Sequence, residues 1–400
     1  MSSEPETDRS RDLSQPLENL GPDETMKVES NYLRGTIEQS LADEVTRGVS
    51  EIDNKLLKFH GMYQQDDRDI RDERRRQKLE PDFTFMARLR VPGGVCTPGQ
   101  WLKIDELARE YGKESLRVTT RQTFQYHYIR KYNLKTLLQG LREVLIDTKA
   151  ACGDDNRGVM CTVNPNLSQV HGEVYADACR TSEHALHQTG AYEEIWYGEE
   201  GKKKTRKKKA GTDPEEPFFG KQYMPRKFKI GFAIPPSNDI DVYSQDLGFI
   251  AIQEDGELKG YNVTVGGGLG RTDRAPETYP RLGDVIGFIE AGQLLPTVDA
   301  VMSVQRDYGD RTVRAHARFK YTVDDKGVDW IKAEIERRLG FGLAPTREYS
   351  FTSNGDPLGW IKGEDGREHC TLFIQNGRIV NRPDRPLLDG LRAVARIHKG

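Results

Sequence analysis

The 400-residue sequence predicts an α+β protein of two or three domains, in which an early strand–helix module recurs near the end of the chain, after a mixed α/β middle segment. The strongest observation is the strict alternation of apolar and polar residues from Ser115 to Tyr128, which is typical of a β-strand. Apolar residues at helical spacing follow this segment, and they recur after a second set of strand-like segments late in the chain.

Composition excludes several classes of protein. Hydrophobic residues make up 36% of the chain and charged residues 31%, which is typical of a soluble globular protein. A formal net charge of -3 argues against a general nucleic-acid binder. No apolar run approaches the roughly 18 residues of a membrane span, and the first residues, MSSEPETDRSRD, lack the apolar core of a signal peptide. We expect a cytoplasmic protein with neither a membrane nor a nucleic acid as its partner.

The cysteines form no recognisable metal motif. None lies in a C-x-x-C pair, so we expect no zinc or iron–sulfur ligand set within this chain. In a reducing compartment they are interpreted as small buried apolar residues. The five are Cys96, Cys152, Cys161, Cys179 and Cys370.

Two stretches lack periodicity. Residues 1–25 are acidic and rich in Ser and Pro, which predicts a disordered tail, and residues 26–80 are expected to form an extended N-terminal arm. The stretch GEEGKKKTRKKKAGTDPEEP (198–217) carries a block of positive charge. A solvated insertion loop is the favoured interpretation, and a nuclear-localisation or nucleic-acid patch is the alternative.

Residues 81–150 are predicted to form a strand–helix–strand–helix module. FTFMARLRV (83–91) alternates, PGG (92–94) turns, and helical spacing follows from Trp101 to Tyr111 and from Leu137 to Leu145. The strand between these helices has an unusual polar face, rich in hydrogen-bond donors and without a carboxylate. Such a face suits a large flat anion with many carboxylates, although a solvated strand face is the alternative. Its members are Arg117, Thr119, Arg121, Thr123, Gln125 and His127.

The middle segment is predicted to be α+β. RKFKIGFAI (226–234) alternates and places Lys227 and Lys229 on one face. A hairpin is expected to turn at Asp255-Gly256. The glycine cluster at 266–270 matches neither a dinucleotide fingerprint nor a P-loop, so it is either a plain turn or a close backbone approach to a ligand.

The last segment repeats part of the first module. LGWIKG (358–363) and HCTLFIQ (369–375) are expected strands, Asn376-Gly377 is a hairpin signal, and residues 385–397 have helical spacing. The chain ends where the first module would begin its donor-rich strand, so we expect a duplicated module whose second copy is incomplete.

Eight stretches between residue 27 and the end occur in the same order as in one known family: ESNYLRGTI (29–37), KFHGMYQQDDRD (58–69), LRVTTRQTFQYH (116–127), NRGVMCTVNP (156–165), MPRKFKIGFAIPPSNDID (224–241), VGGGLG (265–270), QRDYGDRT (305–312) and RPLLDGLRAVARIHKG (385–400). Together they resemble the hemoprotein subunit of assimilatory sulfite reductase, in the sulfite/nitrite reductase superfamily. The resemblance implies two ferredoxin-like half-domains, at 81–150 and 346–400, around a siroheme- and substrate-binding domain at 151–345.

The resemblance also implies a reaction and its cofactors. The family reduces sulfite to sulfide with six electrons at a siroheme bridged to a [4Fe–4S] cluster, in assimilatory sulfur metabolism. It implies that Arg88, Arg157, Lys227 and Lys229 bind sulfite. Siroheme would be bound by the donor-rich face and by four further residues: Arg117, Thr119, Arg121, Thr123, Gln125, His127, Gly267, Gly268, Arg306 and Arg311.

One departure from the family pattern concerns the cluster. The family's cysteine pairs, at C-x5-C and C-x3-C spacing, are expected beyond residue 400, so the chain is either a fragment or a natural truncation. We expect residues 1–400 alone to be aggregation-prone and inactive. A nitrite reductase and a non-catalytic siroheme- or anion-binding remnant are the alternatives, and the electron donor is either a flavoprotein subunit or a ferredoxin.

Overall fold

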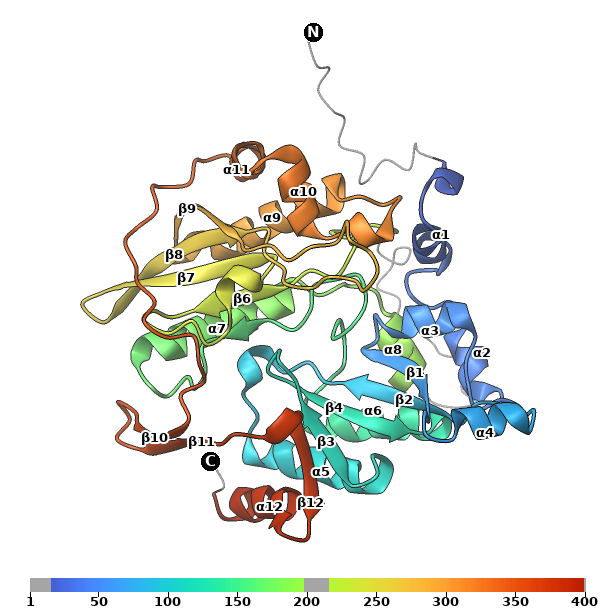
Figure 1. The fold of residues 1–400 in the computed structure, drawn as a ribbon. Helices are drawn as coiled ribbons and strands as arrows, with labels where there is room; N and C mark the ends of the chain where they lie inside the picture. Colours follow the sequence, from blue (N-terminus) through green and yellow to red (C-terminus); the bar gives the residue numbers. More distant parts are fainter. Residues whose placement is uncertain (1–15, 198–215, 399–400) are drawn as a thin grey trace, which may run out of the picture. The chain divides into compact units, whose positions relative to one another are not determined.

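The computed structural model describes residues 16–197 and 216–398, which belong to two compact units (Figure 1). Unit 1 consists of the chain up to Val28, Asp154–His187 and Phe218–Phe373, and unit 2 of Glu29–Gly153, Gln188–Pro217 and the chain from Ile374 onward. The break after Gly153 lies close to the domain boundary predicted at 151, whereas the boundary predicted at 346 has no counterpart. Within the described residues, no helix has both the length and the apolar character needed to cross a membrane.

Unit 2 contains a six-stranded sheet covered by helices. Helix α5 (Pro98–Tyr111) begins at a capping box between Thr97 and Gln100 and buries Ile104, Leu107 and Ala108. Helix α6 (Leu134–Glu143) packs against α5 and against α8 (Ala191–Tyr197). The strands, in their order across the sheet, are β1 (Met62–Asp66), β2 (Phe83–Arg88), β4 (Phe124–Ile129), β3 (Ser115–Val118), β12 (Arg378–Arg382) and β13 (Arg385–Pro386).

The donor-rich segment is a hairpin, so the prediction of a single strand is wrong. Strands β3 and β4 pair with Arg117 opposite Gln125, and the Thr119 amide donates to the Thr123 carbonyl at 2.9 Å. Gln122 takes a positive φ of 50° in the connection. Directly paired residues of antiparallel strands project to the same face. This register therefore keeps alternate residues on one face, although the chain reverses between them.

The last segment is divided between the two units. Strands β10 (Gly359–Lys362) and β11 (Glu368–Thr371) form a separate two-stranded sheet in unit 1. Strand β12, which was not predicted, then pairs with β3 and extends the sheet of the first module (Figure 1). Helix α12 (Leu387–Ile397) lies within the predicted helix and packs against α5 and β12. The physical reason is that β3 offers a free edge and α12 an apolar face, with Leu388 fully buried.

The predicted tail and extended arm are also corrected. Residues 17–29 include a 3₁₀ turn (Leu17–Asn19) and α1 (Pro22–Glu29). Lys27 of α1 is buried, and its Nζ donates to the Glu24 carboxylate at 2.5 Å and to the Met224 carbonyl at 2.9 Å. The arm is helical rather than extended, and its strand β1 pairs with β2. Its helices are α2 (Ile37–Ala42), α3 (Glu51–Leu57) and α4 (Arg71–Arg76). Residues 1–15 and the basic stretch 198–215 lie outside the described residues.

A buried lysine organises the loop after α2. The Lys131 ammonium donates to four backbone carbonyls: Ser40 at 3.1 Å, Asp43 at 2.5 Å, Thr46 at 2.6 Å and Gly48 at 3.1 Å. Ser40 lies in the last turn of α2, where carbonyls have no partner within the helix, and the other three acceptors lie outside helices and strands. Buried carbonyls need a donor. One side chain therefore fixes the path of the loop.

Unit 1 is built on a five-stranded mixed sheet. Its first three strands run parallel and its last three antiparallel, in the order β5 (Met160–Cys161), β6 (Ile230–Ala233), β7 (Leu247–Glu254), β8 (Glu257–Val265) and β9 (Asp284–Glu290). The hairpin turn at Asp255-Gly256 is confirmed, with positive φ at both residues. The helices are α7 (Gln169–His184), α9 (Leu294–Tyr308), α10 (Phe319–Lys326) and α11 (Val328–Leu339).

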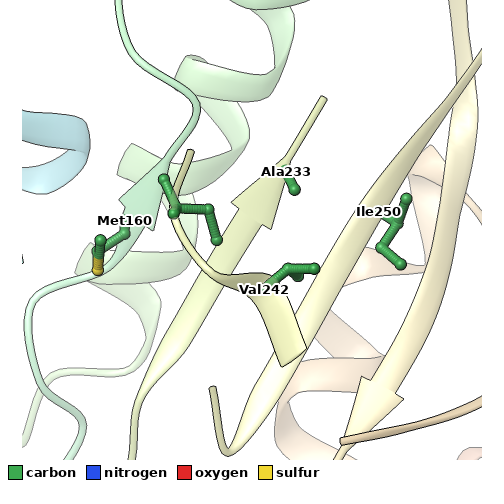
Figure 2. Close-up of a cluster of buried hydrophobic side chains, with 5 residues drawn as sticks. Met160, Ala233, Val242 and Ile250 are labelled. Carbon is green, nitrogen blue, oxygen red and sulfur yellow. The ribbon is translucent and has the colours of Figure 1, made fainter. Parts of the chain in front are cut away.

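The two faces of this sheet are covered differently. On one face Phe232 and Phe249 stack and Tyr261 meets both rings edge-on. The Tyr261 hydroxyl donates to Asp177 of α7 at 2.5 Å. The neighbouring strand residues Ala233 and Ile250 point to the opposite face. There they join a cluster that includes Met160 and Val242 (Figure 2). The aromatic side chains of Tyr243, Tyr349 and Phe351 pack against this cluster.

Candidate functional site: two groups of anion-binding side chains

The first group lies on the sheet of unit 2. Strand register places Arg88 of β2 opposite Gln125 of β4, and Gln125 opposite Arg117 of β3. With its amide oxygen turned toward Arg88, Gln125 accepts from Nη2 and Nε of that guanidinium at 2.6 and 2.7 Å. Arg88 Nη1 also donates to the Ala151 carbonyl at 3.0 Å. Two arginines and an amide thus line up across three strands.

His127 belongs to the same face and stays neutral. The pKa of its imidazole is lowered to about 4, first by burial and then by the charges of Arg117, Arg88 and Arg378. Its Nδ1 lies 3.1 Å from the Gln65 Oε1 atom. At neutral pH it is therefore a hydrogen-bonding group among cations and not a further positive charge.

The other predicted residues of this face lie in the hairpin connection. Thr123 is buried, and its hydroxyl donates to the Leu89 carbonyl at 2.6 Å, so this proton already serves the fold. Thr119 Oγ1 accepts from the Arg121 amide at 3.2 Å. Arg121 is half-buried at the tip of the hairpin.

The second group lies at the start of β6 in unit 1. A parallel bridge joins Asn156 to Phe228. In this bridge the Phe228 amide donates to the Asp155 carbonyl at 2.9 Å, and the Arg157 amide donates to the Phe228 carbonyl at 2.8 Å. Paired residues share a face and their chain neighbours take the other. Arg157, Lys227 and Lys229 therefore project from the same side of this small ladder.

The electrostatics show how closely these cations gather. The pKa of Lys227 is lowered to about 7, first by burial and then by the neighbouring charges of Arg157, Lys229, Arg318 and Arg226. A lysine that loses its charge near neutrality lies in an environment that favours an anion. We refer to these five side chains as the lysine–arginine cluster.

Two members of the cluster, Arg226 and Arg318, were missed by the sequence analysis. Arg226 lies 3.6 Å from the Asp154 carboxylate, and Arg318 Nη2 lies 3.2 Å from Asp246. The buried Nε of Arg318 has no hydrogen-bond partner in the structure. Arg226 directly precedes Lys227, but the alternation argument considered only residues on the lysine face.

Asp155 has an unusual place beside the cluster. It projects from the same side of the ladder as Arg157 and is fully buried, and neither of its carboxylate oxygens has a hydrogen-bond partner among the residues that the structure describes. Burial raises the pKa of this carboxyl well above its usual value. The sequence analysis gave it no role.

Arg306 and Arg311 are both engaged by groups of the protein. Arg306 is buried, with Nε 2.6 Å from the Asp307 carboxylate and Nη1 2.5 Å from the Phe218 carbonyl. Arg311 donates to Glu24 at 2.6 Å and to the Tyr223 carbonyl at 2.7 Å. Both were expected to bind siroheme, but the acids and carbonyls that engage them lie within the protein.

The glycine cluster also serves the fold. A Cβ on Gly267 would lie 2.1 Å from the Tyr243 carbonyl oxygen, so two backbone segments of this chain meet there. A Cβ on Gly268 would lie 2.9 Å from Arg318 Nη2. The close approach considered for this cluster is therefore internal at Gly267, whereas Gly268 leaves room for a side chain of the lysine–arginine cluster.

The residues described here do not fit an iron–sulfur cluster. No three His, Cys, Asp or Glu side chains within 16–197 and 216–398 gather as metal ligands. No disulfide joins the cysteines of the described residues, and they are scattered over both units. The prediction that the cluster ligands lie beyond residue 400 stays a prediction.

Comparison with known families gives two matches. Residues 76–144 match the family described as nitrite/sulfite reductase ferredoxin-like half domain, and residues 176–343 match the nitrite and sulphite reductase 4Fe-4S domain. The first match confirms a ferredoxin-like half-domain in this part of the chain, and with the mixed sheet of unit 1 it confirms the α+β class; the bounds 81–150 stay a prediction.

Individual relatives agree. The chain is 70% identical over its whole length to the sulfite reductase [NADPH] hemoprotein beta-component of Nitrobacter winogradskyi, and it spans 68% of that protein. It is 59% identical to the beta-component of Nitrosomonas europaea, covering 99% of this chain and 67% of the relative. The structure of the NirA protein of Mycobacterium tuberculosis has a similar fold, with a TM-score of 0.72 over 98% of this chain and 65% of that one, at 21% identity. On this evidence the chain belongs to the sulfite reductase hemoprotein beta-component family of nitrite and sulfite reductases.

Proposed function

We propose that this protein is a siroheme-dependent assimilatory sulfite reductase that reduces sulfite to sulfide with six electrons. The observation that carries the proposal is the lysine–arginine cluster, in which neighbouring cations and burial bring the pKa of Lys227 to about 7. Such a site attracts a small dianion and holds a group able to give up a proton near neutral pH.

The donor-rich face fits the carboxylates of siroheme. Arg117, Gln125 and His127 present donors without an acid on that face, and arginine forks suit carboxylates in a bidentate manner. We propose that these side chains hold the cofactor together with Thr119, Arg121 and Thr123 of the same unit, while the contact predicted for Gly268, in unit 1, stays a prediction. The unpartnered Nε of Arg318 is a further donor for an anion. When bound, siroheme supplies electrons to the sulfur of sulfite.

The chain's own residues would bind the substrate and supply protons. We propose that Arg157, Lys227 and Lys229 of unit 1 bind the sulfite oxygens, while the role of Arg88, in unit 2, stays a prediction from the sequence. Their charges stabilise the dianion and the charge that builds up as S–O bonds break. Each oxygen leaves as water and takes up two protons, and Lys227 is suited to give one because its ammonium is only weakly basic here.

Electrons would come from a partner protein. The relatives carry NADPH in their name, so we propose an NADPH-dependent flavoprotein subunit as the donor in preference to a ferredoxin. A [4Fe–4S] cluster is part of the matched family's description. We derive no step through it, because the described residues contain no ligand group for it.

Two substitutions in the holoenzyme test the assignment. Lys229→Ala should leave siroheme content unchanged and lower sulfite turnover, because it removes a charge that acts on the substrate. Arg121→Ala should lower siroheme content, since a hydrogen bond to a charged group contributes about 1.5–3 kcal/mol. Siroheme absorbance per chain and sulfide production are measured, with the exposed Arg396→Ala as the control. Loss of siroheme in Lys229→Ala but not in Arg121→Ala would contradict the assignment, and faster turnover of nitrite than of sulfite would favour a nitrite reductase.

A further inference from the structure

Strand β12 adds a third arginine to the donor-rich face. Register pairs Arg378 with Arg117, Arg117 with Gln125, and Gln125 with Arg88. Because directly paired residues project to one face, these four side chains form a straight row across β12, β3, β4 and β2. We call it the arginine row.

The row is electrostatically unfavourable without an anion. Like charges directly opposite each other on neighbouring strands destabilise a sheet. Within the described part of the chain, no carboxylate forms an ion pair with Arg117 or Arg378. The low pKa of His127, to which Arg378 contributes, shows that the field of all three guanidiniums meets at one point. Arg117 is half-buried and Arg378 is exposed, so an anion that binds from solvent can reach both.

The dimensions of the row indicate the kind of anion. Neighbouring strands lie about 4.8 Å apart, so four strands spread the row over about 14 Å. A single small oxyanion would have to draw all three long side chains to one point of the row. A flat ligand with carboxylates around its rim can meet them along the row, and the planar guanidinium suits a carboxylate.

We propose that Arg378 is a carboxylate-binding residue of the siroheme site, so that the C-terminal strand β12 is itself part of the cofactor site. This inference rests on the proposed function. Strand β12 is joined to β3 through only three residue pairs. A ligand that bridges Arg378 and Arg117 therefore stabilises the pairing of the two strands, and by linkage a well-paired β12 strengthens ligand binding.

The experiment uses the full chain, with siroheme and with uroporphyrin, a metal-free tetrapyrrole octacarboxylate, as probes. Binding is followed by absorbance or quenched fluorescence, and hydrogen exchange at Ile379 and Val380 reports on strand β12. Arg378→Ala should weaken binding of both probes about tenfold or more and abolish the ligand-induced protection of β12. Arg378→Lys should lose less, because it keeps the charge without the fork. The control, Arg396→Ala, removes an exposed arginine of α12 and should behave as wild type.

The outcomes separate the two proposals. If the wild type binds neither probe, the proposed function fails. If the wild type binds both and Arg378→Ala binds them equally well, the assignment of Arg378 is wrong and the siroheme proposal stands. Thermal unfolding of the ligand-free variants shows that they are folded, and Arg378→Ala should melt no lower than wild type because it removes a like-charge pair.

Discussion

At the scale of single residues, Lys227 links the electrostatics of the lysine–arginine cluster to a pH dependence. Its pKa of about 7 belongs to a site without an anion. A bound dianion favours the ammonium form, so below pH 7 the lysine is already charged, and above it binding has to take up a proton. We expect sulfite affinity to fall as pH rises from 6 to 9, and to fall less in Lys227→Met. Dissociation constants across this range measure the effect, and because sulfite's own titration is common to both proteins, parallel curves would contradict the prediction.

Asp155 predicts a different pH dependence, in stability. Its folded pKa is raised, so its contribution to stability is intact below the pKa of the unfolded chain, about 3.9, and is lost as pH rises toward the folded value. Asp155→Asn should therefore raise the free energy of unfolding more at pH 8 than at pH 5. Urea unfolding at both values tests this, with the exposed Asp273→Asn as the control. An equal gain at both pH values would show that Asp155 is ionised in the folded protein.

Arg306 gives the opposite kind of test, because it separates a structural arginine from a cofactor contact. Arg306→Gln leaves the buried Asp307 carboxylate without one of its partners, and breaking a buried pair costs about 3–5 kcal/mol. Denaturant unfolding should show that loss, and siroheme affinity of the folded variant should match wild type. Arg274→Gln, at a side chain that is 93% exposed, is the control. A stable variant with weakened siroheme binding would restore the role predicted from the sequence.

The sequence separates such residues poorly. Lys227 and Lys229 could be placed on one face because alternation depends only on the local chain. The sequence could not show whether Arg306 and Arg311 are engaged within the protein. The partner of Arg306 is its neighbour Asp307, whose side-chain direction is unknown from sequence, and the partner of Arg311 is Glu24, which lies far away along the chain. Arg378 was missed for the same reason: nothing local shows that its strand pairs with β3.

At the scale of elements, the hairpin shows how a periodicity argument can identify the face correctly and the element wrongly. The register that pairs 117 with 125 and 119 with 123 is symmetric about residue 121, so odd-numbered residues stay on one side whether or not the chain turns. Sequence alternation therefore predicted the shared face, but it could not show the reversal, since no Gly or Pro marks the turn.

Helix α12 provides the prediction at this scale. Leu388 is fully buried in the packing of α12 on unit 2, whereas Val394 is 55% exposed. Leu388→Ala should lower the free energy of unfolding by about 2–5 kcal/mol and loosen β12, because the helix holds that strand in place. Val394→Ala should change it by no more than about 0.5 kcal/mol. Unfolding curves combined with hydrogen exchange in β12 decide the matter, and equal effects of the two substitutions would mean that α12 does not depend on this packing.

At the scale of the whole molecule, the chain alternates between the two units. It passes from one to the other after residues 28, 153, 187, 217 and 373. Contiguous domains were predicted because composition and motifs are read along the chain, and neither shows that α1 belongs with residues 154–373. The cause is the buried network in which Glu24 and Lys27 meet Arg311 and the Met224 carbonyl.

This arrangement predicts that unit 1 needs its distant N-terminal segment. A chain that begins at Glu29 leaves the buried Arg311 without its carboxylate partner, so it should unfold at a clearly lower urea concentration than the full chain. Glu24→Gln with Lys27→Gln in the full chain should reproduce much of that loss. If the shortened chain unfolds like the full one, the network does not stabilise unit 1.

The loop around Lys131 has a consequence for how the protein responds to its surroundings. Calcium-binding loops gather carbonyl and carboxylate oxygens around a free ion. Here the four carbonyls gather around an ammonium that is covalently part of the chain. Neither chelators nor dilution can remove that cation, so the shape of the loop is independent of metal supply. It depends instead on the chemical state of one amine, and carbamylation or acetylation of Lys131 would release the segment from 40 to 48.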